Sequence, residues 1–446
     1  MSEATIGAEA RARRRRRWQA PEGSLWRHGD FNRLWFGQSI SVLGSEITTL
    51  ALPLTAIVML GASAFQIGLL NAFGSVATLF FMLFAGAIVD RVRRRRVMVV
   101  ADLGRAALIG LIPILAAFGH LSMPILYAVV VFVGAFTVLF ELAYFAYLPT
   151  IVEKDDLVPA NARLQGSESF GGIAGGTLGG SLVTIFRPAY ALIGDAISFV
   201  VSAVSLLMIR RPERPVERPK EDVGNQMKAV LKDIGAGIGP NFRNAYLRPL
   251  TFNSATANFL AQIVLTLFVL YAARDLKIPP LWIGVIFAAG SAGGVVGALL
   301  TSFMTRRFGF GRTLIGSMLA YRVIIVTPLI AGPKSLVIVL LAITWFVTVV
   351  GVVMGNISQG TLRQVVTPDE LMGRVMGAHR TLAYGTVPLA ALVAGFLGSA
   401  IGVRTTMLIT TVLLPLTLGW VLSSPIPRLR TVHDAVADQA EPEPKD

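Results

Sequence analysis

Long apolar runs separated by short polar links make up most of the chain. A helix that crosses a bilayer needs about 20 mostly apolar residues, and about twelve runs reach that length. The pattern therefore predicts an all-α membrane protein with about twelve transmembrane helices. The predicted spans are 34–60, 65–89, 97–118, 124–148, 164–185, 189–209, 249–272, 280–304, 312–331, 335–357, 375–399 and 403–423.

The longest polar stretch between two spans divides the chain near its middle. Residues 210–215 read Arg-Arg-Pro-Glu-Arg-Pro, and a helix does not continue through them because proline lacks an amide donor. After residue 427 the chain is acidic and contains proline, which is typical of disorder. The predicted domains are a cytosolic basic arm (1–30), a first six-helix half (31–210), a cytosolic linker (211–247), a second six-helix half (248–424) and a cytosolic tail (425–446).

Positive charge gathers in the links that follow even-numbered spans. Arginine and lysine near span ends resist translocation, so these links are expected in the cytoplasm together with both termini. The links after odd-numbered spans are short and nearly uncharged, with 274–277 as the main exception. We therefore expect a multi-pass protein of the inner or plasma membrane. The positive residues are the arginines of 91–96, Arg163, those of 210–232, and Arg306, Arg307, Arg312, Arg363 and Arg374.

Composition narrows the class of protein further. Only 15% of the residues are charged and 54% are hydrophobic, whereas soluble domains carry roughly 25% charged residues. The chain contains no cysteine and four scattered histidines, so we expect neither a metal site nor a cofactor. Without a nucleophile–base motif or a phosphate-binding loop, neither an enzyme nor an ATP-driven pump is expected. The net charge of +14 is placed at span ends and in the arm, which favours anionic lipids over nucleic acid as its partner.

The two predicted halves repeat each other. Ile67-Gly68 with Gly74-Ser75 recurs as Ile283-Gly284 with Gly290-Ser291. After nearly the same offset, Arg95 and Arg105 recur as Arg312 and Arg322, and 152–157 recurs as 366–371. Because an even number of spans separates the copies, both halves have the same orientation in the membrane.

A motif of glycine, aspartate and arginines joins the second and third predicted spans. It reads Gly86-x-x-x-Asp90-Arg91-x-x-Arg94-Arg95, and it resembles the signature loop between helices 2 and 3 of major facilitator superfamily transporters. The resemblance extends from residue 31 to 424 and implies two parallel six-helix halves around a substrate site near the midplane. Further segments resemble the enterobactin-exporter-like and macrolide/tetracycline-efflux branch, namely 43–48 with 51–53, 101–106, and 147–149 with 161–165.

The same resemblance implies a gate between the halves. In relatives the acid of the signature loop locks the cytoplasmic side, so Asp90 is expected at the N-terminal end of helix 11 near 372–376, where the helix dipole favours an anion. The alternative is a surface pair of Asp90 with Arg93 or Arg94. The gating candidates are Gly86, Asp90, Arg91, Arg95, Arg105 and Glu141.

Arg105 and Glu141 lie at similar depths on consecutive predicted spans, roughly 12–14 Å from the cytosolic ends. This placement permits an ion pair between the two helices, which would lower the cost of burying each charge. Asp102, one helical turn from Arg105, competes for the same arginine. We expect the pair to have a structural or gating role.

The fifth predicted span carries closely spaced glycines. Small residues at four-residue spacing let helix backbones approach closely. The register also resembles the exporter signature Gly-x-x-x-Gly-Pro-x-x-Gly-Gly of the family, with glycine in place of the proline, which implies export. Ordinary glycine packing is the alternative. The exporter-motif glycines are Gly171, Gly175, Gly176, Gly179 and Gly180.

Two acids are predicted at membrane depth. Glu46 lies roughly 20 Å from the cytosolic end of the first span, and Asp195 lies roughly 9 Å below the outer end of the sixth. A charge there costs several kcal/mol unless it is paired or hydrated, so each is a candidate proton carrier or attractor of a cationic substrate. The alternatives are a hydrogen bond from Glu46 to neighbouring helices and contact of Asp195 with lipid headgroups. Span 124–148 lacks the arginine that many proton-coupled drug exporters of the family have there, so their proton pathway does not transfer.

Spans 1, 4, 7 and 10 line the substrate cavity in the superfamily. The resemblance implies a secondary transporter, which we expect to be a monomer. It is expected to exchange protons for small amphiphilic compounds, such as a drug, a macrolide or a siderophore-like molecule, by alternating access. A non-transporting membrane sensor or partner protein that retains the fold is the alternative. The proton and substrate candidates are Glu46, Asp195, Thr49, Tyr144, Asn258, Gln262, Trp345 and Asn356, with Phe140 and Glu141 on the same spans.

Overall fold

The computed structural model describes residues 28–89, 92–153, 156–211, 213 and 235–440. Asp90, Arg91, nearly all of the basic arm and most of the 211–247 linker lie outside these ranges, as do the predictions made for them. Within the described residues every regular element is helical, and twelve helices are long and apolar enough to cross a membrane. The predicted fold class, an all-α membrane protein of about twelve spans, is confirmed.

The helices form two groups in chain order, and several end at other residues than predicted. Helix α12 continues to Val366 instead of ending at 357, and the eleventh span is interrupted at Gly385 and Thr386. The first group contains α2 (Gly29–Leu54), α3 (Ala64–Val89), α4 (Arg94–Ala117), α5 (Met123–Ile151), α6 (Leu157–Phe186) and α7 (Pro188–Leu207). The second contains α9 (Leu247–Leu270), α10 (Pro280–Phe308), α11 (Phe310–Arg322), α12 (Lys334–Val366), α13 (Met372–Tyr384), α14 (Val387–Ala400), α15 (Val403–Leu416) and α16 (Gly419–Leu422).

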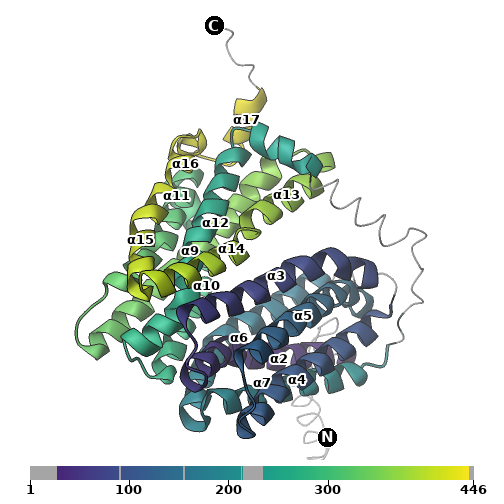
Figure 1. Ribbon diagram of the computed structural model, residues 1–446. Coiled ribbons are helices and arrows are strands. Elements are labelled where there is room, and N and C mark those ends of the chain that lie inside the picture. Colours follow the sequence, from purple (N-terminus) through teal and green to yellow (C-terminus); the bar gives the residue numbers. More distant parts are fainter. Residues whose placement is uncertain (1–27, 90–91, 154–155, 212, 214–234, 441–446) are drawn as a thin grey trace, which may run out of the picture.

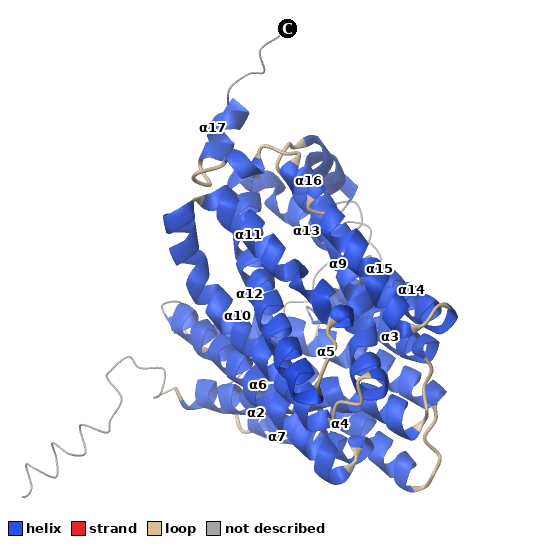
Figure 2. Cartoon of the chain, turned by 90° about the vertical axis from the view of Figure 1, so that its left-hand side faces the viewer, coloured by secondary structure: helices blue, strands red, loops and turns tan. Residues whose placement is uncertain are grey.

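Each group is held together by its own helix contacts. Helix α2 packs on α6 and α7, while α4 packs on α5 and α7. In the second group α12 packs on α10 and α11, and α9 packs on α13, α14 and α15. The two groups meet mainly through α6 with α10 and α3 with α14, which lie side by side in both views (Figure 1, Figure 2).

The contacts between the groups gather at one end of the bundle. We call the helix ends beside links 60–63, 118–122, 276–279, 330–333 and 401–402 the short-link face, and the opposite ends the basic face. A Cβ atom added to Gly68 would lie 2.6 Å from the carbonyl oxygen of Ala391, and one added to Gly284 would lie 2.1 Å from that of Gly176. Only glycine permits these backbone approaches. Toward the basic face the ribbons of the two groups diverge (Figure 1).

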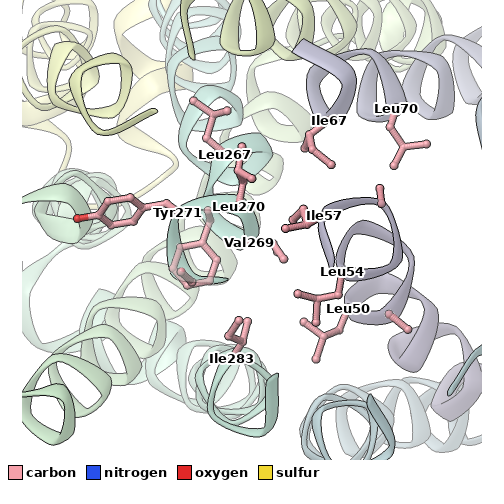
Figure 3. Packing of buried hydrophobic residues seen from close by; sticks show 14 of the residues in the cluster. Leu50, Leu54, Ile57, Ile67, Leu70, Leu267, Val269, Leu270, Tyr271 and Ile283 are labelled. Carbon is pink, nitrogen blue, oxygen red and sulfur yellow. The ribbon is translucent and has the colours of Figure 1, made fainter. Parts of the chain in front are cut away.

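An apolar cluster fills the junction near the short-link face. Leu50, Leu54 and Ile57 of the first group face Val269 and Leu270 of the second (Figure 3). Leu50 and Leu54 are completely buried. Burying such side chains stabilises a contact by about 1.5–3 kcal/mol each when water is the alternative. The junction therefore excludes water from the space between the two groups at this end.

The predicted disorder of the tail is wrong for residues up to 440. Leu429 and Arg430 accept backbone hydrogen bonds of 2.9 Å from Gly311 and Phe310 at the start of α11. Helix α17 (Asp434–Ala440) follows and contacts α12. Hydrogen bonds from Thr431 and from the Arg430 amide keep the pKa of the Asp434 carboxyl below its usual value. The acidic composition suggested disorder, but apolar Leu429 is buried against the second group.

Candidate functional site

Arg105 forms a buried ion pair on its own helix. Its guanidinium binds the Asp102 carboxylate one turn earlier on α4, and Asp102 is completely buried. The guanidinium carbon lies 4.5 Å from the ring centroid of Phe140 on α5 and 4.2 Å from that of Phe199 on α7. Two aromatic faces and one carboxylate therefore hold this cation inside the first group.

The predicted ion pair between Arg105 and Glu141 is wrong, since none joins them in the described chain and Glu141 is exposed on α5. Asp102 is favoured because it lies on the same helix, where residues three apart are neighbours. Glu141 still attracts Arg105 electrostatically over a longer distance.

Asp195 lies inside the first group and interacts electrostatically with Arg105. It is only 1% exposed, and it accepts hydrogen bonds from Thr48 on α2 and from Ser198, whose Oγ is 3.0 Å away. A Cβ atom on Gly44 would lie 2.6 Å from the Asp195 carboxylate, so glycine lets α2 approach this acid. The carboxylate therefore points into the helix group and not toward headgroups. With Asp102 and Arg105, it forms what we call the acid–arginine cluster.

Glu46 is half-buried on α2 and differs from Asp195 in its surroundings. Within the described residues its carboxylate makes no hydrogen bond or ion pair, so the alternative of a hydrogen bond to neighbouring helices is not found. A Cβ atom added to Gly175 on α6 would lie 2.5 Å from the Glu46 Cβ. Thr49, one turn further on, is exposed and donates to the Ser45 carbonyl at 3.1 Å.

The glycines of α6 allow close packing against two neighbouring helices, α2 and α10. Gly171, Gly175 and Gly179 face α2, where an added Cβ would meet Val42, Glu46 or Ile47 within 2.5–3.1 Å. Gly176 and Gly180 face α10, where an added Cβ would lie 2.9 Å from the Gly284 oxygen and 2.7 Å from the Pro280 oxygen. One side of the motif therefore packs α6 inside its own group, and the other side forms the junction between groups.

The gating candidates of the signature loop are described only in part. Gly86 belongs to the last turns of α3, and Asp90 and Arg91 lie outside the described residues. Arg95 donates from Nε to the Leu206 carbonyl at 2.7 Å and also binds the Leu207 carbonyl, so it caps the end of α7. The expected contact of Asp90 with 372–376 stays a prediction.

A cavity of about 370 Å³ with both polar and apolar lining residues lies within the second group, between α9, α11, α12 and α13. Three candidates from the sequence, Asn258, Gln262 and Asn356, line it. Asn258 donates to the Ala383 carbonyl at 3.2 Å, and Gln262 donates to Thr266 at 3.2 Å. The structure therefore brings these three amides to one cavity.

Two cationic or titratable residues of this cavity were not anticipated. The sequence predicts Arg363 in a cytosolic link, but it lies in α12 and is only 8% exposed. His379 on α13 is also buried and lines the same cavity. The spacing Asn356, Gln359, Arg363 puts three polar side chains on one helix face, and this stripe is the sequence signal that indicates the cavity.

The remaining substrate candidates lie elsewhere. Trp345 packs among aromatic rings, with its centroid 4.6 Å from that of Phe268 and 5.0 Å from that of Phe287. It belongs to the apolar cluster near the short-link face and does not line the cavity. Tyr144 is buried in the first group and stacks on Phe140, at 6.1 Å between centroids. Among the described residues no group of three or more acids and histidines has the spacing to hold a metal ion.

Comparisons with known proteins agree with this architecture. The family profile described as Major Facilitator Superfamily matches residues 34–388. The multidrug efflux pump Tap of Mycolicibacterium fortuitum is 28% identical over 403 residues, covering 87% of this chain and 93% of Tap. The enterobactin exporter EntS of Salmonella typhi is 26% identical over 373 residues, covering 81% of this chain and 84% of EntS.

Solved transporters have the same fold. A bacterial homologue of the iron transporter ferroportin in an inward-facing state superimposes with a TM-score of 0.70 at 16% identity, covering 90% of this chain and 99% of that one. The nucleoside transporter NupG superimposes with a TM-score of 0.67 at 14% identity, covering 88% and 98%. Together with the family profile, these folds indicate a transporter rather than an enzyme. Because the family profile covers well over half of the sequence, the chain belongs to the major facilitator superfamily of membrane transporters.

Proposed function

We propose that the protein is a proton-coupled exporter of small amphiphilic compounds that works by alternating access in the cell membrane. The observation that carries this proposal is the one-ended junction between the helix groups, closed through glycines of α3, α6, α10 and α14 near the short-link face. A rocking motion of two halves, 31–210 and 248–424, would open this junction and close the basic face. With the topology expected from charge, the basic face is cytoplasmic and the structure corresponds to an inward-open state.

Export is the direction that two independent features favour. The α6 glycines keep the register of the exporter signature, and Gly176 and Gly180 lie in the junction that must open. The relatives Tap and EntS are named as an efflux pump and an exporter. We propose amphiphilic substrates because the second-group cavity joins amides such as Asn258 and Asn356 to apolar residues such as Leu265 and Val352.

The acid–arginine cluster supports proton coupling. Arg105 pairs with Asp102, and within the described residues Asp195 has no ion pair and only hydroxyl groups as side-chain hydrogen-bond partners. An ionised carboxylate without its own cation is costly at membrane depth, so one proton would neutralise this cluster. Asp195 lies between α2, α4 and α7, where a change in helix packing would alter the cost of its charge. We therefore assign the proton site to Asp195, with Glu46 as the second candidate.

The test uses purified protein in vesicles with an imposed pH gradient and a panel containing a macrolide, a tetracycline and an amphiphilic dye. We expect gradient-driven accumulation of at least one compound by the unmodified protein. Asp195→Asn should abolish the response to the gradient but keep binding and gradient-independent exchange, because the amide cannot titrate. Glu153→Gln, which changes an exposed carboxylate on the basic face, should leave transport unchanged.

Four outcomes would contradict parts of this proposal. Full coupling in Asp195→Asn would exclude Asp195, and full coupling in Glu46→Gln would exclude Glu46. No flux of any panel member by folded protein would favour the alternative of a non-transporting sensor or partner protein. Flux only in the uptake direction would overturn the assignment of export.

A further inference from the structure

The cavity of the second group has an unusual balance of charge. Arg363 and His379 both line it, and none of its described lining residues is acidic. Burying a guanidinium without a counter-charge is expensive, so such a cation is normally paired with a carboxylate. The Arg105–Asp102 pair of the first group follows that rule. Arg363 departs from it.

The hydrogen bonds of Arg363 leave donors unused. One terminal nitrogen donates to Gln359 Oε1 at 3.1 Å, and the Nε–H is buried without a partner. The same Gln359 oxygen also accepts a hydrogen bond of 3.0 Å from Ser254, which fixes its position. A guanidinium presents five donors in a planar fork. The fork of Arg363 is therefore oriented by Gln359 but is not saturated by the protein.

Arg322 of the same group shows what a saturated arginine looks like. It is also buried, and it donates to Asn253 at 2.7 Å, Thr417 at 2.6 Å and the Met318 carbonyl at 2.8 Å. Its Nε donates to Leu414 at 3.2 Å. Neutral acceptors on several elements therefore satisfy Arg322, which is structural. Arg363 makes one such bond, to Gln359, and lines the cavity, so the remaining donors of its fork call for an acceptor that enters the cavity.

We propose that this cavity binds the anionic group of the transported compound, a carboxylate, sulfonate or phosphate, through Arg363. The amides of Asn258 and Asn356 provide further donors, while Leu265 and Val352 contact the apolar part of the molecule. A volume of about 370 Å³ suits one acidic group with an attached ring. The substrate class is thus an amphiphilic organic anion. This inference rests on the transport function proposed above.

A matched pair of fluorescent probes tests it. Anilinonaphthalene sulfonate and its uncharged parent phenylnaphthylamine differ only in the sulfonate, and both are titrated into full-length protein in phosphatidylcholine vesicles, with protein-free vesicles subtracted. We expect tighter binding of the sulfonate to the unmodified protein. Arg363→Gln should weaken sulfonate binding roughly tenfold or more, because a charge-assisted, fork-shaped contact is lost. Binding of the neutral parent should change less than about twofold.

Two further variants separate charge from geometry. Arg363→Lys keeps the positive charge but loses the planar fork, so its sulfonate affinity should lie between those of Arg363 and Arg363→Gln. Arg380→Gln removes one positive charge from an exposed position of α13 outside the cavity lining, and it should leave both affinities unchanged. If Arg363→Gln does not fold, the loss of sulfonate affinity in Arg363→Lys alone tests whether Arg363 binds the anion.

Equal affinity of the unmodified protein for both probes would overturn the inference, and so would unchanged sulfonate binding in Arg363→Lys and Arg363→Gln. The experiments distinguish a failure of the anion site from a failure of the proposed transport function. Arg363-dependent sulfonate binding without gradient-driven flux would support the anion site and contradict transport. Gradient-driven flux of cationic and neutral compounds, with no preference for anions, would support transport and contradict the anion site.

Discussion

Replacing Arg105 by glutamine is expected to destabilise the protein by about 3–5 kcal/mol, one of the two largest effects that we anticipate. The substitution leaves the Asp102 carboxylate completely buried without its cation, and it removes the cation from between Phe140 and Phe199. Thermal unfolding in detergent micelles, followed by tryptophan fluorescence, should therefore show a strongly lowered midpoint.

Two matched variants distinguish loss of the ion pair from loss of packing. The double variant Asp102→Asn with Arg105→Gln removes both charges and should recover much of the lost stability. Arg363→Gln should not lower the midpoint in the same way, because no described carboxylate loses a partner when that cation is removed. An Arg105→Gln variant as stable as the unmodified protein would contradict the ion-pair assignment.

The number of membrane-spanning helices can be predicted from the sequence. A bilayer fixes the length of an apolar run, so hydropathy alone predicts the number of spans. It does not predict where a helix ends. Arg363 follows the last strongly apolar residues of its span, and the charge was therefore placed in a link. Helix α12 nevertheless continues to Val366, and Arg363 is buried at the edge of the cavity.

The internal repeat predicts where buried arginines lie, but it does not predict which residues they bind. Arg105 and Arg322 correspond in the two halves, and both are buried. The position that corresponds to Asp102 is Leu319, so the second copy keeps the arginine without the acid. Asn253 from α9 and Thr417 after α15 satisfy Arg322 instead. Local spacing cannot show such partners, because they come from distant parts of the chain.

Depth along a helix is another quantity that the sequence leaves open. Trp345 and Asn356 were both predicted to contact substrate because they lie on the tenth span. They are separated by three turns, so Trp345 lies in the apolar cluster and Asn356 in the cavity. The sequence likewise does not show which helices the glycines of α6 contact. Helical period places Gly171 and Gly176 on different faces, but only the tertiary structure shows that these faces meet α2 and α10.

Cross-linking α6 to α10 at the middle of α6, where the two helix groups meet, is expected to stop transport completely. A Cβ atom added to Gly172 lies 3.0 Å from the Ser291 Cβ, and a disulfide needs about 3.5–4.5 Å between its Cβ atoms. A shift of roughly half an ångström therefore suffices for Gly172→Cys with Ser291→Cys to form a disulfide. The chain contains no cysteine, so no other thiol competes. The bond would hold the junction closed, and the alternation on which transport depends requires it to open.

Cleavage at a protease site inserted into the 211–247 linker reports the bond, because cross-linked halves migrate as one band on a gel. Gly171→Cys with Ser291→Cys is the matched control, since Gly171 faces Val42 of α2 and not α10. Oxidation should join the halves and stop flux only in the Gly172→Cys, Ser291→Cys variant. A reducing agent should then separate the halves on the gel and restore flux. Undiminished flux with quantitative cross-linking would show that the junction need not open. A failure to cross-link would show that the two helices do not meet there in the membrane.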